Sequence, residues 1–384
     1  MQRRLLLRVT AGASIAAALP LAGCSLSSDY PAEAVQAWAG PGQERDVRRW
    51  LLGWAILAPH SHNLQSWLVD LSRPDEITLY CDRTRLLPQT DPFSRQMMMS
   101  QGTFLELLAI AAKERGLRAD IELFPQGEFG AQGVDARPTA HIRLAPDASA
   151  RRDPLFAQLT HRHTHRGAYE PRMPQPGALA AIDKAASAPA LRTGFVTEAD
   201  AAAIAQHRAI ASEAWRIELV TPRTIMESYK VLRVGPAEIA QHRDGLSINT
   251  PMVRALAAVG LFDRTKAPGP GDIATRSQVD EFNAHMAATP SFFWMVTAAN
   301  DRKTQVNAGR AYVRAQLAAT AQGLVMQPLS QALQEYPEQA LPYRRIHELL
   351  AGAQGTVQMW TRLGYASPAP AAPRRGIDAH ILHA

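Results

Sequence analysis

A pattern that occurs twice constrains the fold of this chain more than any other feature of the sequence. The pattern is G-x13-G-L, found as Gly102 with Gly116–Leu117 and again as Gly309 with Gly323–Leu324. Both copies contain Ala-Ala at the same offset, and each has the apolar spacing of a long helix that follows a strand and a polar loop. The same helix in the same context twice predicts two related α+β units fused in one chain.

Hydrophobic periodicity predicts the elements of these two units. Apolar residues at helical spacing predict helices at 44–58, 95–117, 152–160, 176–187, 198–216, 222–232, 251–260 and 307–324. Alternating or continuous apolar runs predict strands at 76–81, 121–124, 139–145 and 291–297, with a further strand at the end of the chain. We therefore expect a first unit at residues 43–150 and a second unit at residues 151–384.

The first residues have the pattern of a targeting segment and are excluded from the fold. A basic start precedes an apolar run that is too short and too rich in small side chains to span a membrane. The run ends in LAGC at Leu21–Cys24, which resembles a bacterial lipobox, where cleavage leaves Cys24 to be lipidated. A cleaved signal peptide that happens to contain a cysteine is the alternative. We expect a signal peptide at 1–24, a tether at 25–42, and an exported lipoprotein anchored on the periplasmic side of a membrane; the basic start loosely resembles a twin-arginine signal.

The charge and cysteine content narrow the class of protein. The whole chain has a formal net charge of +6, and the targeting segment supplies three of these charges and no acid, which leaves +3 on the rest. So modest a charge does not predict nucleic-acid binding. Cys81 is the one cysteine besides Cys24, so no intramolecular disulfide is expected once Cys24 is lipidated. A chain with 46% hydrophobic residues must be held together by its core.

A polar cluster follows the first long predicted helix. In the stretch ILAPHSHNLQSW, Pro59 ends the helix and is followed at once by His60, Ser61, Asn63 and Gln65. Hydroxyl and amide groups donate and accept hydrogen bonds without charge, which suits a flat heterocyclic ligand. The same residue types also cap helices and form turns, so local capping of the backbone is the alternative.

Two short basic segments are candidates for binding phosphate. In the segment THRHTHRG, Arg162, Thr164 and Arg166 alternate with histidines. Guanidinium groups and a hydroxyl at this density suit a phosphate. Arg374 and Arg375 form another basic pair just before the last predicted strand. Solvated surface charge is the alternative interpretation of both segments.

The histidines raise the alternative of a metal site. His60 and His62, and the alternating histidines at 161, 163 and 165, supply suitable ligand types. Histidines at this spacing converge on one ion most easily in a strand, and no acidic or cysteine cluster accompanies them, so we expect no metal. The sequence also lacks GxSxG, HExxH, GxGxxG and GxxxxGK[ST], so the commonest hydrolases and nucleotide-binding proteins with motifs are not predicted.

Three segments resemble motifs of the nitroreductase superfamily, whose members are flavin enzymes that bind FMN. APHSHNLQSW is similar to the family's APSxxNxQPW, RHTHRGAYEP to its RRSxRxF phosphate-binding start, and PRRGIDAHI to its closing basic segment. ITLYCDRTRLLPQTDPFSRQ and the helix GRAYVRAQLAATAQGL resemble the Acg branch, in which two nitroreductase-like units share one chain. The resemblance covers most of residues 43–384. It implies an α+β, nitroreductase-like FMN-binding fold in which the two units form an internal pseudo-dimer.

The resemblance also implies where FMN binds, between the polar loop of the first half and the basic groups of the second. Contacts to the isoalloxazine and ribityl groups would come from Pro59, His60, Ser61, Asn63 and Gln65. Contacts to ribityl and phosphate would come from Arg162, Thr164, Arg166, Arg374 and Arg375. The chain departs from the family's motifs at His60 and Ser66, which replace Ser and Pro, and at Thr164, which replaces Ser.

The function that the resemblance implies is an FMN-dependent oxidoreductase. A donor would reduce FMN and leave before a nitroaromatic, quinone or similar acceptor enters, in ping-pong fashion. This chemistry requires no acid or base, so no catalytic side chain is nominated. NAD(P)H is not expected in bulk around an exported lipoprotein, so the donor stays open, and a non-catalytic flavin-binding or flavin-sequestering lipoprotein is the alternative. Because a fused pair supplies both sides of the site, we expect a monomer whose partners are small molecules and a membrane.

Overall fold

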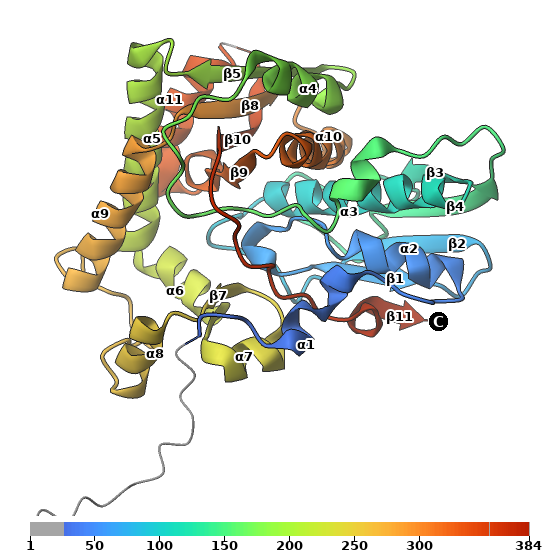
Figure 1. Ribbon diagram of the computed structural model, residues 1–384, viewed down its shortest axis with the longest axis horizontal. Coiled ribbons are helices and arrows are strands. Elements are labelled where there is room, and N and C mark those ends of the chain that lie inside the picture. Colours follow the sequence, from blue (N-terminus) through green and yellow to red (C-terminus); the bar gives the residue numbers. More distant parts are fainter. Residues whose placement is uncertain (1–26, 353, 384) are drawn as a thin grey trace, which may run out of the picture.

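Of the three sheets in the described residues, the two larger ones have four principal strands that follow the same order. A computed structural model describes residues 27–352 and 354–383, so the expected signal peptide and Cys24 lie outside the described residues. The first sheet has the order β1-β2-β4-β3, with the last strand, β11, added parallel to β1, and the second has the order β5-β8-β10-β9 (Figure 1). The strands are β1 (Trp67–Asp70), β2 (Glu76–Cys81), β3 (Leu117–Leu123), β4 (Ala140–Pro146), β5 (Leu191–Thr197), β8 (Ser291–Thr297), β9 (Val325–Pro328), β10 (Thr356–Gly364) and β11 (Ile381–His383). The expected α+β class is confirmed.

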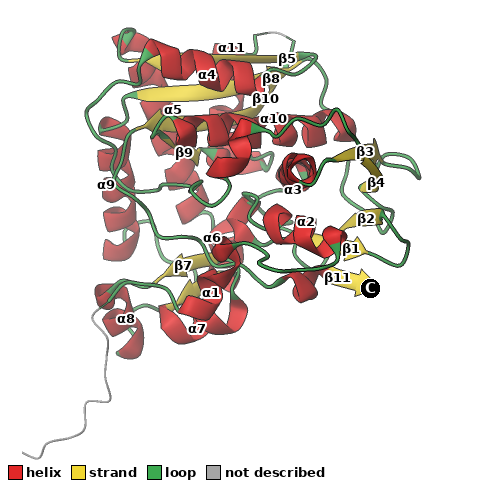
Figure 2. Ribbon diagram, turned by 45° about the vertical axis from the view of Figure 1, so that its right-hand side comes forward, coloured by secondary structure: helices red, strands yellow, loops and turns green. Residues whose placement is uncertain are grey.

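In each of these sheets, a long helix connects the strands that come second and third along the chain. α3 (Arg95–Glu114) runs from β2 to β3, α10 (Arg302–Ala321) runs from β8 to β9, and the two helices pack against each other between the sheets (Figure 2). A Cβ atom on Gly102 would lie 1.9 Å from the carbonyl oxygen of Val306, and one on Gly309 would lie 1.9 Å from that of Met99. The first glycine of each G-x13-G-L copy therefore lets the two helix backbones touch.

The first residue of each of these helices is a buried arginine that reaches into the other half of the chain. Arg95 donates to the carbonyl oxygens of Leu333 at 3.0 Å and Gln358 at 2.9 Å. Arg302 donates to four carbonyl oxygens in the first half, those of Phe93, Gly130, Ala131 and Gly133. Each half thus supplies one arginine to the other. The halves are therefore joined at the start of each helix and also where the two helices touch at Gly102 and Gly309, which we call the glycine crossing.

The connection between the first two strands of the second sheet is long and forms a layer of its own. We call residues 198–290 the insertion. It holds α5 (Ala201–Val220), α6 (Pro222–Lys230), β6 (Leu232–Val234), α7 (Gly235–His242), β7 (Leu246–Ile248), α8 (Pro251–Ala258) and α9 (Ile273–Ala287). The other helices are α1 (Ala32–Val35), α2 (Val47–Ala55), α4 (Pro176–Ala186) and α11 (Ala340–Leu350), with 3-10 turns η1 (Gln36–Ala39), η2 (Ser61–Asn63), η3 (Pro154–Gln158), η4 (Ser330–Leu333), η5 (Pro337–Gln339) and η6 (Ile377–His380).

The two sheets differ in how they are covered. Along β2 and β3, more buried side chains alternate with more exposed ones. The first sheet therefore packs one apolar face against α2 and α3 and turns a polar face to solvent. In the second sheet β8 is buried along nearly its whole length. Helices α4 and α10 cover one face of that sheet, and α5, α9 and α11 cover the other. The second sheet is therefore the more enclosed of the two.

Most of the predicted elements form close to their predicted bounds. The strands expected at 76–81 and 291–297 begin and end as predicted. The helix expected at 152–160 is wrong in part, because only the 3-10 turn η3 forms there, capped at its start by the Asp153 side chain. After Leu159 the chain turns so that Thr164 can pair with Met326 beside the second sheet, which leaves no room for a longer helix.

The tether expected at 25–42 is wrong for the part that the structure describes. Residues 32–39 form α1 and η1 and pack on the body of the protein. Ala34 is buried there, and Trp38 Nε1 donates to the carbonyl oxygen of Ala372 at 2.7 Å. The apolar side chains of this segment explain the difference, since a free tether would leave them in water.

Candidate functional site

Three residues of the polar loop have left-handed backbone conformations. The φ angle is 48° at His62, 53° at Asn63 and 56° at Gln65, and none of the three is glycine. Such conformations cost on the order of 1–3 kcal/mol each and persist only where the surroundings hold them. Backbone strain of this kind clusters at binding and catalytic sites, so the loop is the first candidate for a functional site.

The arginine pair near the end of the chain holds the strained loop. Arg374 Nη1 donates to Asn63 Oδ1 at 2.6 Å, and the backbone N–H of Arg375 donates to Gln65 Oε1 at 2.9 Å. Gln65 Nε2 donates in turn to the carbonyl oxygen of Arg243, at 2.9 Å. Arg374 also donates to the carbonyl oxygens that follow α2, those of Ile56, Leu57 and Ala58. Its guanidinium is therefore engaged in fixing the loop against the end of α2.

His60 is held neutral inside the loop. Burial lowers its pKa to about 3. Nδ1 lies 2.8 Å from the carbonyl oxygen of Ser61, and Nε2 lies 3.0 Å from the backbone nitrogen of Ser66. An N–H can only donate and a carbonyl oxygen can only accept, so these contacts assign the proton to Nδ1. Both ring nitrogens serve to shape the loop.

Pro59 and Ser61 dock the loop on α3. Thr103 Oγ1 donates to the carbonyl oxygen of Pro59 at 2.7 Å. The backbone N–H of Ser61 donates to Ser100 Oγ at 3.2 Å, and Ser61 Oγ donates to Gln96 Oε1 at 3.2 Å. The loop is thus fixed on one side by the central helix α3 and on the other by the arginine pair.

Arg162 reaches the end of α2 from the second half of the chain. Its Nη2 donates to the carbonyl oxygen of Leu57 at 3.0 Å and its Nη1 to Gln316 Oε1 at 3.2 Å. The guanidinium groups of Arg162 and Arg374 lie 5.6 and 5.2 Å from the ring centroid of Trp38. Burial lowers the pKa of Arg162 to about 10, so it is still charged at neutral pH. Neither arginine has a carboxylate partner among the described residues.

Groups without partners lie beside Arg162. Its own Nε and the hydroxyl of Tyr312 are buried and make no hydrogen bond in the part of the chain that the structure describes. Within the same residues, Arg166 makes no hydrogen bond or ion pair, but its charge acts on Tyr312 and Tyr30. Burial raises the pKa of the Tyr312 hydroxyl, and the charges of Arg162 and Arg166 oppose that rise. Thr164 lies between the two arginines in sequence, in an isolated bridge to β9.

The insertion closes the loop from a third side. His62 Nε2 lies 3.3 Å from Ser228 Oγ on α6, and the backbone N–H of Gly245 donates to the carbonyl oxygen of Asn63 at 3.1 Å. Burial, together with the charge of Arg166, lowers the pKa of His62 to about 4. The imidazole beside the basic segment is therefore neutral at neutral pH.

The structure brings together most of the residues predicted to bind the cofactor. Pro59, His60, Ser61, Asn63, Gln65, Arg374 and Arg375 form one hydrogen-bonded unit around α2 and α3. Arg162 joins this unit through Leu57. Arg166 acts on His62 through its charge, which brings the basic segment to the loop, whereas the described contacts of Thr164 are with β9. The assignment of these ten residues to a cofactor stays a prediction.

Sequence reasoning missed three side chains of this region. Trp38 lies in the stretch taken for a tether. Tyr312 and Gln316 lie four residues apart on the buried face of α10, directed to Arg162. A polar or phenolic side chain repeated at helical spacing inside an otherwise apolar helix was the signal that could have found the last two.

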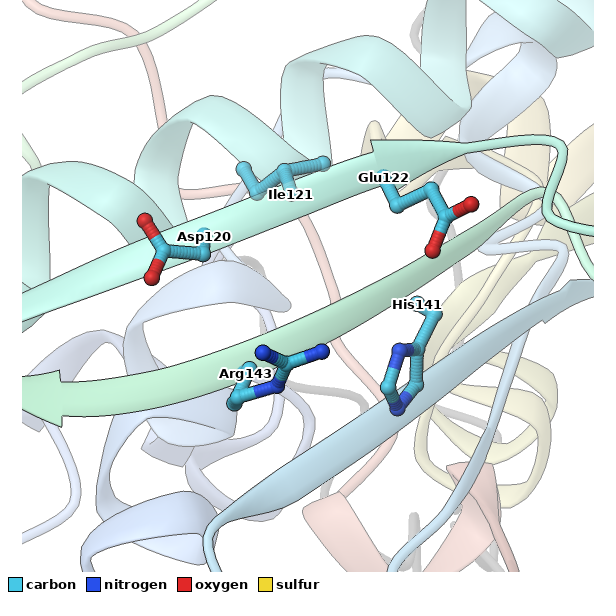
Figure 3. Close-up of a pocket in the computed structure, with 5 residues that line it drawn as sticks. All are labelled: Asp120, Ile121, Glu122, His141 and Arg143. Atoms are coloured by element: carbon cyan, nitrogen blue, oxygen red, sulfur yellow. The ribbon is translucent and has the colours of Figure 1, made fainter.

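Other candidate sites are weaker. The described residues contain no group of three His, Cys, Asp or Glu side chains that could hold a metal ion. A hollow of about 260 Å³ on the polar face of the first sheet is lined by Asp120, Ile121, Glu122, His141 and Arg143 (Figure 3). None of the predicted site residues lines it. Across the part of the chain that was described, no helix combines the length and apolar character needed to cross a membrane.

Comparison with known proteins relates the chain to nitroreductases. No family model matches it. It is 27% identical over 87% of its length to "Putative NAD(P)H nitroreductase Rv3131" of Mycobacterium tuberculosis, covering 91% of that protein. It is 34% identical over 125 residues, 30% of the chain and 33% of the relative, to "Probable NAD(P)H nitroreductase PigM" of a Serratia strain. Both relatives are named for the superfamily that the three sequence motifs resemble.

Solved structures give matches of the same kind. The structure of "a putative nitroreductase" from Anabaena variabilis covers 87% of this chain and 91% of its own, at 11% identity and a TM-score of 0.41. The FMN-dependent nitroreductase NfnB of Mycobacterium smegmatis, solved with NADPH, covers 58% of this chain and 94% of its own, at 18% identity and a TM-score of 0.37. At such TM-scores the fold is better described by the strand orders of the chain itself.

Proposed function

We propose that this protein is an FMN-binding oxidoreductase of nitroreductase type, which passes hydride or electrons to a nitroaromatic, quinone or similar acceptor. One observation carries the proposal. Arg162 and Arg166 have no carboxylate partner among the described residues, and the buried Arg162 Nε and Tyr312 hydroxyl make no hydrogen bond there. Arg162 is buried, whereas Arg166 is exposed. A buried positive charge such as that of Arg162 is costly unless an anion joins it, and phosphate oxygens accept well from guanidinium groups. The donor set therefore fits the phosphate of FMN.

The strained loop fits the uncharged part of the same cofactor. His60 and His62 are neutral at neutral pH, and Asn63 and Gln65 carry no charge, so the loop is an uncharged part of the site, as a flat ring requires. The contacts from Arg374 and Arg375 hold the loop in one shape. We assign Arg162 and Arg166 to phosphate binding and Arg374 and Arg375 to positioning of the loop. When bound, FMN supplies the redox chemistry by accepting and returning a hydride or electrons.

The names of the relatives support the class of reaction. The match to a protein named as an NAD(P)H nitroreductase runs over 87% of this chain. We therefore propose NAD(P)H as the first donor to test. A membrane quinol is the second, because it would be at hand for an exported protein.

We further propose an arrangement in which two nitroreductase-like units, 43–150 and 151–384, act as an internal pseudo-dimer in a monomer. The shared strand order, the glycine crossing and the exchanged arginines support it.

The LAGC pattern supports lipidation at Cys24 and export to the periplasmic side of a membrane.

The proposed cofactor is tested by an absorption spectrum of the purified protein, with heat release and identification of any yellow compound. The double variant Arg162→Ala/Arg166→Ala should then lose FMN, because each charge-assisted phosphate contact is worth about 1.5–3 kcal/mol. Together the two losses weaken binding by roughly 10²- to 10⁴-fold. The matched control is Arg151→Ala/Arg152→Ala, which removes two exposed arginines ten residues or more upstream and should keep FMN. Stoichiometric FMN in the first double variant would refute the phosphate site.

Turnover is tested separately from binding. The FMN-loaded protein is mixed with NADH, NADPH or a reduced quinol without oxygen, and bleaching of the flavin band is followed. Rapid bleaching, reversed by a nitroaromatic or quinone, supports the oxidoreductase. Stable colour with every donor would leave the flavin-sequestering lipoprotein as the function.

A further inference from the structure

An exposed apolar surface lies at the outer corner of the insertion, outside the proposed cofactor site. Four large apolar side chains are exposed there: Met252 (70%), Val259 (68%), Leu261 (75%) and Ile273 (78%). Helix α8 (Pro251–Ala258) contains no buried residue, so this part of the insertion contributes little to the core. We call the four side chains the apolar corner. Four of the seven large apolar side chains that are exposed in the described residues belong to it, and all four fall between residues 252 and 273, so they are concentrated in one stretch of the chain.

The described chain begins beside this corner. Both views of the ribbon show the first described residues next to β7 and α8 (Figures 1 and 2). Asn249 Nδ2 donates to the carbonyl oxygen of Asp29, and the Tyr30 hydroxyl donates to the carbonyl oxygen of Ser247 at 3.2 Å. Asn249 is two residues from the start of α8, so the N-terminal segment is fixed at the base of the corner.

Chain length then limits where Cys24 can be. Ser27 is the third residue after Cys24, and an extended chain covers at most about 3.6 Å per residue. Cys24 therefore lies within about 11 Å of Ser27. If Cys24 carries the lipid that we propose above, the surface of the bilayer comes equally close to Ser27, which precedes the residues fixed at the base of the corner.

The composition of this region suits a bilayer surface. Residues 251–276 contain four basic and two acidic side chains: Arg254, Arg264, Lys266 and Arg276, with Asp263 and Asp272. Part of this charge is neutralised locally, since Arg264 pairs with Glu238 at 2.7 Å and Lys266 with Asp263 at 3.5 Å. Exposed apolar side chains flanked by a small positive excess favour the interface of an anionic membrane.

We propose that the apolar corner docks on the lipid surface in which Cys24 is anchored, with its four side chains among the headgroups. The lipid chain would hold the protein at the membrane, and the corner would fix which side of the protein faces it. This inference rests on the lipidation proposed above, and mass analysis of the N-terminal peptide reads that lipidation independently.

The test places an environment-sensitive fluorophore on a cysteine introduced into the corner. Leu261→Cys is labelled in the full processed protein and reconstituted with vesicles of phosphatidylethanolamine and phosphatidylglycerol. The matched control is Leu341→Cys, since Leu341 is also exposed (42%). It belongs to helix α11, which lies at the opposite end of the molecule from α8 (Figure 1). Cys81 is buried and will not label readily, and protein without an introduced cysteine gives the background.

We expect the probe at 261 to shift to shorter wavelength and to be quenched by a lipid-borne quencher, while the probe at 341 does neither. The pair Met252→Cys and Leu382→Cys repeats the comparison if either first variant fails to fold. A probe at 261 that stays in water on vesicles, while the N-terminal peptide has the mass of a lipidated cysteine, would overturn the docking and leave the lipidation standing. The docking on lipid would also be overturned if the fluorescence of the probe at 261 shifted only when another protein was added and not when vesicles were added.

Discussion

The two sheets share a strand order but differ in where they carry their long connections. In the first, eleven residues (56–66) lead from α2 to β1 and only five (71–75) from β1 to β2. In the second, four residues (187–190) lead from α4 to β5, whereas the insertion of 93 residues leads from β5 to β8. Each half has thus lengthened a different connection on the same frame.

The two long connections meet at one place. Ser228 of the insertion contacts His62 of the polar loop, and the carbonyl oxygen of Arg243 accepts from Gln65. The equivalent position of the second half has only a short turn. The repeated parts, helices and glycines, therefore build the interior, and the parts that do not repeat build the candidate site. If FMN binds there, as we propose, a chain with two related halves has one binding site in place of two.

The largest expected effect tests the shared frame. Gly102→Ala and Gly309→Ala each place a Cβ atom 1.9 Å from a backbone carbonyl oxygen of the partner helix, which cannot move aside as a side chain could. Each should lower the free energy of unfolding by more than about 3 kcal/mol, although alanine favours the helix itself by about 1 kcal/mol. The measurement is urea unfolding followed by circular dichroism.

The control is Gly177→Ala in α4, where a Cβ atom meets nothing within 4 Å. It should change stability little. If only one of the two Gly→Ala variants lowered the free energy of unfolding, the two helices would not contribute equally to stability. The two halves would then not be equivalent at the contact that joins them.

The second prediction is that titratable groups in the polar loop and in the insertion change the stability of the protein with pH in opposite directions. Burial lowers the pKa of His60 to about 3 and of His62 to about 4, so the folded protein binds fewer protons there than the unfolded chain. Their contribution to stability is present above about pH 6.5 and is lost as the pH falls. Burial raises the pKa of Glu218 in the insertion to about 7, so its contribution is present below about pH 4.5 and is lost as the pH rises toward 7.

Between pH 4.5 and 7 the two effects oppose each other. Glu218→Gln should remove the second, so that stability rises more steeply with pH, by up to about 1.4 kcal/mol per pH unit. The control is Glu213→Gln, whose carboxylate forms a surface pair with Arg216 and has a lowered pKa, so the slope above pH 5 should stay as in the wild type. An unchanged slope in Glu218→Gln would mean that Glu218 is ionised in the folded protein.

Much of the frame could be predicted from the sequence, because period and repeat are local properties. The helix at 95–117, the strand at 76–81 and the occurrence of two equivalent glycine-containing helices follow from spacing alone, whereas the packing of these two helices on each other was seen only in the structure. Helix α9 was missed because its sequence is polar around most of its circumference, and its few buried side chains pack on α5 and the second sheet. The short strand β1 was missed because four residues give too little alternation.

The candidate site could be predicted only in part. The residue types of the loop and of the basic segment were found, since each stands in a short stretch. What each residue contacts depends on segments far away in the sequence. Arg374 was expected at a phosphate, yet its donors are engaged by the end of α2 and by Asn63. No local pattern shows that a carbonyl more than three hundred residues away will take those donors.

The smallest expected effect concerns Trp38, the one side chain of the candidate site that precedes both units in the sequence. Trp38 covers the guanidinium faces of Arg162 and Arg374, and nothing before the second sheet corresponds to its segment. A cation–π contact is worth about 0.5–2 kcal/mol, so Trp38→Ala should speed the release of bound FMN by roughly 2- to 30-fold. Trp38→Phe keeps an aromatic face and loses only the hydrogen bond to Ala372, so it should release FMN close to the wild-type rate. Release is followed by the rise of free-flavin fluorescence after dilution. If both variants released FMN at the wild-type rate while the alanine variant unfolded more easily, Trp38 would serve the packing of its own segment, and the site would be built by the two halves alone.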